Sequence, residues 1–214
     1  MIGLLMFVFG GLVFGGLAYN LRVQGPLIEW DRVLANTLPA IALRSPAYAE
    51  GITTAGFYIG NQVLIGFAVL LGIYFVIKRY WQELAMVTIG QVGSTLIFRS
   101  LSYYFDRGRP ATQIWNFRTI PGFPSGHAIA VVTFYGLLAY LLVPKMPSAF
   151  WKVVVVAAAL FVIGLVGFCR VFTGGHYLTD VLAGYALGVA WTGVAFTSIE
   201  LFFQRRRRKK EGAL

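Results

Sequence analysis

Long apolar runs separated by short polar islands are the feature that most limits what this chain folds into. A helix needs about 20 mostly apolar residues to cross a bilayer, and residues 1–21 carry no charged side chain at all. Of the 214 residues, 58% are hydrophobic and only 12% are charged. This composition is typical of integral membrane proteins and excludes an ordinary soluble domain.

Six apolar runs are candidates for membrane-spanning helices, and they cover residues 1–21, 51–76, 84–98, 125–143, 152–169 and 176–203. The sequence therefore predicts an all-α, polytopic six-transmembrane-helix bundle over residues 1–204. Residues 22–50 mix leucines with Trp30, Asp31 and Arg32, which is typical of a segment lying at the membrane interface. Residues 205–214 form a basic tail.

The net charge of +10 does not indicate nucleic-acid binding, because the largest basic cluster, residues 205–210, directly follows an apolar run and contains no aromatic residue. Such a run usually fixes topology by staying in the cytoplasm beside anionic headgroups. An even number of spans places the N-terminus on the same side. The sequence thus predicts cytoplasmic termini and a catalytic site whose loops face the extracytoplasmic side.

The first polar island whose residues are suited to binding or catalysis is Ser125-Gly126-His127. Ser125 follows a proline and precedes an apolar run, so it is a natural N-cap for a helix. The free N–H groups at a helix start bind anions. His127 in that first turn is placed to donate a proton to the leaving oxygen of a bound anion.

The second island combines His176, Asp180 and Arg170, and Arg109 lies in a third. A spacing of four residues predicts that His176 and Asp180 share one helix face. A carboxylate that accepts from one ring nitrogen leaves the other nitrogen free to attack. Arg109 and Arg170 supply planar cations suited to phosphate oxygens.

Each of these residues also has a plain structural interpretation. A lone histidine can simply bridge two helices, and Arg170 can extend to the interface without binding anything. Ser125 as a hydrolase nucleophile is disfavoured, because no G-x-S-x-G turn surrounds it. Ionisable groups within membrane proteins usually mark functional sites, and three ordered clusters favour a catalytic one. No metal site or cofactor is predicted, since metal-ligand motifs are missing.

These islands resemble the three motifs of the type 2 phosphatidic acid phosphatase superfamily, K-x6-R-P, P-S-G-H and S-R-x5-H-x3-D. The matching stretches are residues 102–110, 124–127 and 169–180. The resemblance implies a metal-independent phosphatase with a phosphohistidine intermediate on His176. It also implies that Asp180 orients this nucleophile and that His127 is the general acid. The implied phosphate-binding groups are Arg109, Arg170, Ser125 and the Gly126 amide.

Two positions depart from the motifs, because Ser102 stands where the family has lysine and Cys169 where it has serine. The first change removes a cation from the phosphate-binding groups. Arg99, one helical turn before Ser102, and Arg107, two residues before Arg109, are the candidates to replace that charge.

The expected function is removal of a terminal phosphate from a lipid phosphate or diphosphate in the bilayer. Undecaprenyl diphosphate, phosphatidylglycerol phosphate and phosphatidic acid are the candidate substrates that the resemblance implies. Two alternatives stay open at this point. One is a phosphotransferase that passes the phosphoryl group to a lipid or sugar acceptor, and the other is a catalytically silent relative that only binds lipid phosphates.

Overall fold

The fold consists of helices throughout the part of the chain that the computed structural model describes, which is residues 2–57, 63–111 and 120–211. In chain order the elements are α1 (Ile2–Arg22), α2 (Leu27–Leu43), α3 (Pro46–Phe57), α4 (Val63–Ile77), α5 (Trp81–Phe105), α6 (Gly126–Leu142), a 3-10 turn η2 (Val143–Lys145), α7 (Ala149–Phe172) and α8 (Leu178–Glu211). The all-α prediction is confirmed.

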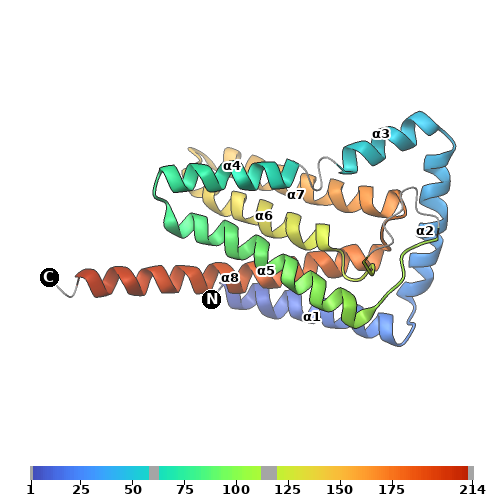
Figure 1. Cartoon of the computed structure of the whole chain (residues 1–214), viewed down its shortest axis with the longest axis horizontal. Coiled ribbons are helices and arrows are strands. Elements are labelled where there is room, and N and C mark those ends of the chain that lie inside the picture. The colour runs from blue at the N-terminus through green and yellow to red at the C-terminus, as the bar shows by residue number, and fades with distance from the viewer. Residues whose placement is uncertain (1, 58–62, 112–119, 212–214) are drawn as a thin grey trace.

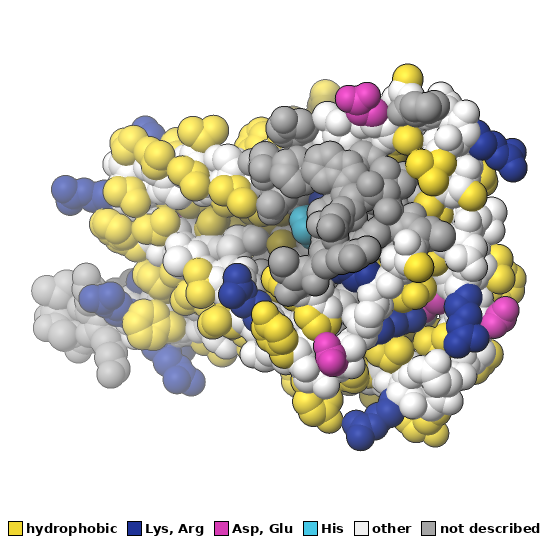
Figure 2. Space-filling view, turned by 45° about the vertical axis from the view of Figure 1, so that its right-hand side comes forward, with side chains coloured by type: hydrophobic (Ala, Val, Ile, Leu, Met, Phe, Trp, Pro, Cys, Tyr) yellow, Lys and Arg dark blue, Asp and Glu magenta, His cyan; other side chains and the backbone are white. Residues whose placement is uncertain are grey.

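The bundle consists of helices that run along one axis, namely α1, α4, α5, α6, α7 and α8, whereas α2 lies across one end of it (Figure 1). Both termini lie toward the opposite end. The outer faces of the long helices are apolar, with Leu12 and Phe161 exposed by 72% and 69%. Figure 2 shows these apolar side chains along the flank, while most Lys and Arg side chains lie toward the two ends. This pattern suits a bundle whose flank contacts lipid.

Within the described residues, five helices are long and apolar enough to cross a membrane, namely α1, α5, α6 with its η2 extension, α7 and the apolar part of α8. The sequence predicted six, and the difference lies in residues 51–76. This range is occupied by α3 and α4, and residues 58–62 between them lie outside the described residues. α4 has 15 residues and is about 22 Å long, which is shorter than the roughly 30 Å hydrocarbon core.

The end of α5 directs the chain toward the end of the bundle that α2 covers. Asp106 caps this helix in a left-handed conformation with φ 43°, and its N–H donates to the Ser102 carbonyl. Aspartate tolerates this conformation better than most residues. Pro110 follows soon after and cannot continue a helix. The polar island that contains Arg109 is therefore a non-helical segment at the bundle end.

α6 lies inside the bundle, since it contacts α4, α5, α7 and α8. Its approach to α8 is close because Gly184 has no side chain. A Cβ built there lies 2.6 Å from both the Ala128 Cβ and the Ser125 carbonyl oxygen. The same device brings α1 to α8, since a Cβ on Gly10 lies 2.4 Å from the Ala186 carbonyl oxygen. These contacts set how far apart the histidine-bearing segments lie.

We expect Gly184→Ala to lower the thermal stability of the protein in detergent, with a cost of about 1–3 kcal/mol from overpacking. The added methyl group meets backbone that cannot rotate away. Gly164→Ala in α7 is the matched control, because nothing lies within 4 Å of its Cβ position. The control gains helix propensity and keeps or raises the melting temperature. Equal melting temperatures for the two variants are incompatible with a tight α6–α8 contact.

Candidate active site

The three polar islands meet at the bundle end that α2 covers, and backbone hydrogen bonds join them. The Gly122 N–H donates to the Arg107 carbonyl at 2.7 Å, which ties the segment before α6 to the segment after α5. The Ser125 N–H donates to the Asp180 carbonyl at 2.9 Å, which ties the start of α6 to the start of α8. Residues far apart in the sequence thus share one rigid frame.

His176 lies in a bend just before α8, which begins at Leu178. The predicted helix start at residue 176 was therefore wrong, and His176 and Asp180 do not share a helix face. The bend arises because α7 ends at Phe172 and Gly174 adopts a positive φ of 69°. The His176 N–H donates back to the Arg170 carbonyl at 3.1 Å. This contact holds the imidazole, which is 2% exposed, against the end of α7.

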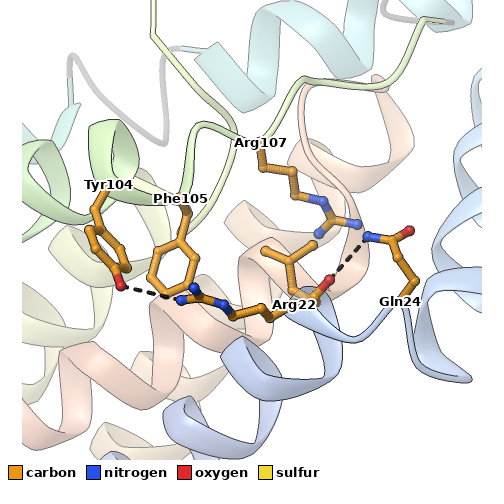
Figure 3. A pocket seen from close by; sticks show the side chains of 6 residues that line it. Arg22, Gln24, Tyr104, Phe105 and Arg107 are labelled. Atoms are coloured by element: carbon orange, nitrogen blue, oxygen red, sulfur yellow. Dashed lines mark hydrogen bonds between the residues drawn. The ribbon is translucent and has the colours of Figure 1, made fainter.

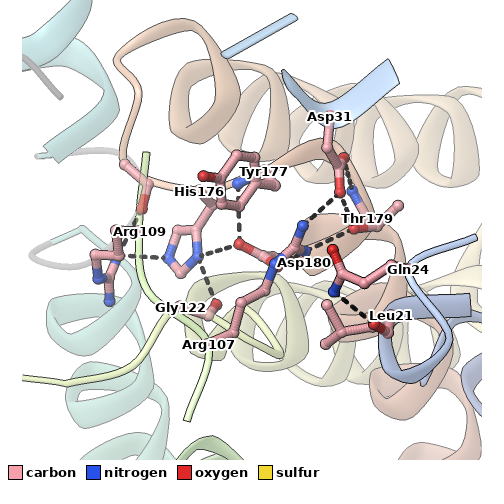
Figure 4. A network of polar contacts seen from close by, with 11 residues as sticks. Leu21, Gln24, Asp31, Arg107, Arg109, Gly122, His176, Tyr177, Thr179 and Asp180 are labelled. Atoms are coloured by element: carbon pink, nitrogen blue, oxygen red, sulfur yellow. Dashed lines mark hydrogen bonds and ion pairs between the residues drawn. The ribbon is translucent and has the colours of Figure 1, made fainter. Parts of the chain in front are cut away.

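The proton on the His176 ring is fixed by a group that the sequence did not indicate. Nδ1 lies 2.8 Å from the Gly122 carbonyl oxygen, which can only accept a hydrogen bond (Figure 4). Asp180 Oδ2 lies 3.6 Å from the same nitrogen, which is too long for a direct hydrogen bond but close enough for attraction. Nδ1 therefore carries the proton, and the lone pair is on Nε2.

Nε2 of His176 faces Arg109, whose Nη1 lies 3.1 Å away. Arg109 itself is held by the Ile120 carbonyl at 3.1 Å and the Gly175 carbonyl at 2.6 Å. Burial lowers the pKa of the Arg109 guanidinium, and the charge of Asp180 opposes that shift. A permanently positive fork thus lies directly in front of the nitrogen that carries the lone pair.

Arg170 and His127 complete the ring of polar groups around His176. Arg170 lies in the last turn of α7 and is 5% exposed. His127 lies in the first turn of α6, and its ring is within electrostatic range of Arg170, His176 and Arg109. The structure brings these four predicted residues together.

Ser125 and Gly126 lie at the start of α6, as predicted. Ser125 occupies the N-cap position, but its hydroxyl makes no capping bond. Its Oγ is buried and has no hydrogen-bond partner among the described residues. A Cβ at Gly126 lies 2.8 Å from the Phe98 ring, so a side chain does not fit there. The helix start thus presents an unpaired hydroxyl, and Phe98 packs against the glycine beside it.

Asp180 is fully buried and is bound on both oxygens. Its Oδ1 accepts from Arg107 Nη1 at 2.5 Å, and its Oδ2 accepts from the Tyr177 N–H at 2.9 Å. Arg107 Nη2 in turn donates to Asp31 Oδ2 at 2.7 Å. Arg107 therefore lies between two carboxylates. Asp180 separates it from His176, and Arg109 lies on the opposite side of His176 (Figure 4). Sequence reasoning missed Asp31, although its register with buried Ile28 and Ala35 on α2 was a usable signal.

The position of the missing lysine is buried, but its neighbour Arg99 is not part of the cluster. Ser102 is completely buried, and its Oγ has no hydrogen-bond partner in the described residues. Arg99 is exposed on α5. No contact joins it to His176 or Arg109 within the described part of the chain. The structure thus buries Ser102 and leaves Arg99 outside the cluster.

Two open pockets lie near the ends of α1 and α5, and Arg109 of the cluster lines one of them. A pocket of 280 Å³ is lined by Arg32, Arg109, Tyr177 and Gln24, among others. A neighbouring pocket of 400 Å³ shares Gln24 and is lined by Arg22, Tyr104, Phe105 and Arg107 (Figure 3). Among the described residues, no three His, Cys, Asp or Glu side chains lie together in a way that would hold a metal ion.

A family model and several known proteins match this chain. The model of the PAP2 superfamily matches residues 61–204. Phosphatidylglycerophosphatase B of Bacillus subtilis is 30% identical over 153 residues, which cover 70% of this chain and 74% of that protein. Lipid A 1-phosphatase of Rhizobium johnstonii is 38% identical over 86 residues, covering 38% of this chain and 31% of that protein.

A solved structure matches over nearly the whole length. It is the crystal structure of a transmembrane PAP2 type phosphatidylglycerolphosphate phosphatase from Bacillus subtilis, with a TM-score of 0.73 and 26% sequence identity. The match covers 95% of this chain and 96% of that one.

We expect His176 to titrate below the usual value of 6.5, because burial lowers its pKa more than Asp180 raises it. NMR of protein with isotope-labelled histidine in detergent measures this directly, since the chain has only two histidines. His176→Gln assigns the signal. Asp180→Asn lowers the pKa of His176 further, because it removes the charge that favours the imidazolium. A His176 pKa at or above 6.5 contradicts this description of the site.

Proposed function

Because the chain belongs to the PAP2 superfamily of membrane lipid phosphatases, we propose that it removes a terminal phosphate from a lipid phosphate through a phosphohistidine on His176. The enzyme class, a lipid phosphate hydrolase, follows from the family. The roles proposed for the residues rest mainly on the placement of His176. Its Nε2, which carries the lone pair, faces Arg109, and its Nδ1 is held by the Gly122 carbonyl.

The proposed reaction has two steps. In the first, His176 Nε2 attacks the phosphorus, the bond from phosphorus to the lipid oxygen breaks, and His127 gives its proton to that oxygen. In the second, His127 takes a proton from water, the water oxygen attacks the phosphorus, and the bond to Nε2 breaks. Inorganic phosphate and free His176 result. His127 thus acts as an acid in the first step and as a base in the second, while His176 is first the nucleophile and then the leaving group.

The proposed phosphate-binding groups are Arg109, Arg170, Ser125 and the Gly126 amide. Phosphoryl transfer depends mainly on positioning and on charge stabilisation, and the half-buried Arg109 and the buried Arg170 supply the positive charge. The unpaired Oγ of Ser125 and the free N–H groups at the start of α6 supply donors without a rearrangement of the backbone. Asp180 is proposed to stabilise the imidazolium from 3.6 Å.

Phosphatidylglycerol phosphate is the favoured candidate substrate. The names of the Bacillus subtilis relatives support it. The pocket in Figure 3 adds a physical reason, because exposed Arg22 lies beside it and Arg32 lines the adjoining pocket. A lipid with a second, diester phosphate gains from such cations near the entrance. Undecaprenyl diphosphate and phosphatidic acid remain the alternatives that a substrate assay separates.

The proposed orientation places the termini in the cytoplasm and the site on the extracytoplasmic side. The basic residues from Arg205 onward and the turn at Lys78 and Arg79 lie toward the end of the bundle away from α2 (Figure 1). Basic residues flanking spans favour the cytoplasm. We also propose that α4 makes a sixth crossing, since it packs against α5 and α6 in the bundle and is almost wholly apolar.

We expect purified protein in detergent to release phosphate from phosphatidylglycerol phosphate in the presence of EDTA. His176→Ala reduces this turnover to background, because the substitution removes the proposed nucleophile. Loss of wild-type activity on addition of EDTA contradicts the metal-free mechanism. Full activity of His176→Ala contradicts the nucleophile assignment, and phosphorylated acceptor in place of free phosphate indicates a transferase.

We expect Arg109→Ala to lower kcat/KM by about 100-fold or more, as removal of a charge-stabilising donor does. Arg99→Ala tests whether that residue replaces the missing lysine. Its exposed position predicts a change of less than about threefold, within the range of a surface charge that acts at a distance. A loss with Arg99→Ala equal to that with Arg109→Ala instead places Arg99 among the phosphate-binding groups.

A further inference from the structure

Asp31 is a buried carboxylate that the proposed reaction does not use. It is 1% exposed, although it belongs to α2, the helix that crosses the end of the bundle. The neighbouring acid on the same helix, Glu29, is 73% exposed and pairs loosely with Arg32 at 3.8 Å. A buried charge is costly unless it is paired and hydrogen-bonded. The contacts of Asp31 therefore indicate what its burial achieves.

Asp31 binds the start of α8 from 148 residues away in the sequence. Its Oδ1 accepts from the Thr179 N–H at 3.0 Å, and its Oδ2 accepts from the Thr179 hydroxyl. Thr179 lies in the first turn of α8, where backbone N–H groups lack partners within the helix. Asp31 thus caps α8 in place of a residue of the α8 segment itself, and Thr179 is the residue directly before Asp180.

Asp31 also reaches Asp180 through Arg107. The guanidinium donates to Asp31 Oδ2 at 2.7 Å and to Asp180 Oδ1 at 2.5 Å. The Tyr177 ring, 4.2 Å from the guanidinium carbon, covers its face. An arginine held on two edges and one face has little freedom to move. Asp31 thus determines both where Arg107 lies and how much of its positive charge acts on Asp180.

We propose that Asp31 is a positioning residue of the active site, which acts through Arg107 and Thr179 to hold Asp180 beside His176 and to preserve the negative charge that Asp180 offers the imidazole. This inference rests on the proposed function of the site. It makes the interfacial helix α2 part of the catalytic apparatus rather than a passive contact with the membrane. No residue of α2 then needs to touch the substrate to affect turnover.

The charge around His176 comes from every element packed against it. These groups are Asp180 in α8, Arg109 and Arg107 in the segment after α5, Arg170 in α7, His127 in α6, Asp31 in α2 and the Tyr177 hydroxyl beside Arg107. Within this set, only two negative charges oppose three arginines. Removing Asp31 leaves the positive charge of Arg107 to be balanced by Asp180 alone. Protonation of His176 then becomes less favourable.

The test compares Asp31→Asn with Glu29→Gln, since each removes one negative charge from α2 with little change in shape. For Asp31→Asn we expect kcat for phosphatidylglycerol phosphate to fall about 10-fold to 100-fold, as for other losses of supporting contacts. KM changes less than about threefold by the same reasoning, because Asp31 does not line the substrate pockets. The acid limb of the profile of kcat/KM against pH moves to lower pH. Glu29→Gln leaves kcat and the profile at their wild-type values.

A purely structural role of Asp31 gives a different result. Partial unfolding lowers apparent kcat equally at every pH and leaves the acid limb in place. The folded fraction of each variant is therefore measured by size-exclusion chromatography and thermal melting. Asp31→Glu, which keeps the charge, is expected to recover the wild-type acid limb. If Asp31→Asn is fully folded and matches Glu29→Gln in kcat and pH profile, the proposal is wrong.

Histidine NMR separates failure of this proposal from failure of the proposed function. If wild-type protein releases no phosphate from any lipid phosphate, the function is wrong, but the His176 titration is still measurable. Asp31→Asn should lower the pKa of His176 there too, and the decrease should be smaller in an Arg107→Gln background, because the positive charge is then gone. An unchanged pKa in the Asp31→Asn protein overturns the positioning role irrespective of activity.

Discussion

The buried contact of Arg107 with two carboxylates is the interaction on which the rest of the site depends. It joins α2, the segment after α5 and the start of α8, and direct hydrogen bonds from Thr179 to Asp31 strengthen the same junction. Burying a charge requires a paired partner, and removing one partner of such a pair costs about 3–5 kcal/mol. The same ion pairs therefore hold both the candidate active site and the packing of these three segments.

Close helix contacts make this frame possible. Gly184 lets α8 approach α6 until Ser125 and Asp180 share a backbone hydrogen bond. Because both helices begin at the same end of the bundle, the first turn of α6, whose N–H groups lack partners within the helix, lies beside the start of α8. His127 and His176 then lie together. The proposed phosphate site is thus a consequence of how two helix starts pack rather than of a single loop.

Much of this was predictable from residue order alone. The long apolar runs predicted α1, α6 and α7 to within a few residues, because lipid leaves the backbone no alternative to helix. They also predicted α5 and α8, but these helices continue past the apolar runs to Phe105 and Glu211. The polar islands predicted the members of the cluster around His176, including Arg109 and Arg170. The Gly122 carbonyl was not predictable, since every residue has one and only the fold brings this one to Nδ1. The same holds for Asp31, whose partners lie 76 and 148 residues away.

The sequence by itself determined the class of protein, the helices and the residue types that carry the chemistry, because hydropathy and local motifs are properties of short segments. The tertiary structure alone decided which group each of these residues faces. Arg107 pairs with Asp31 and Asp180, whereas Arg99 lies on the surface. The Gly122 carbonyl, and not the Asp180 carboxylate, lies within hydrogen-bond distance of His176. The reason is physical: charge pairing and hydrogen bonding act over a few ångströms in space, and distance along the chain does not specify them.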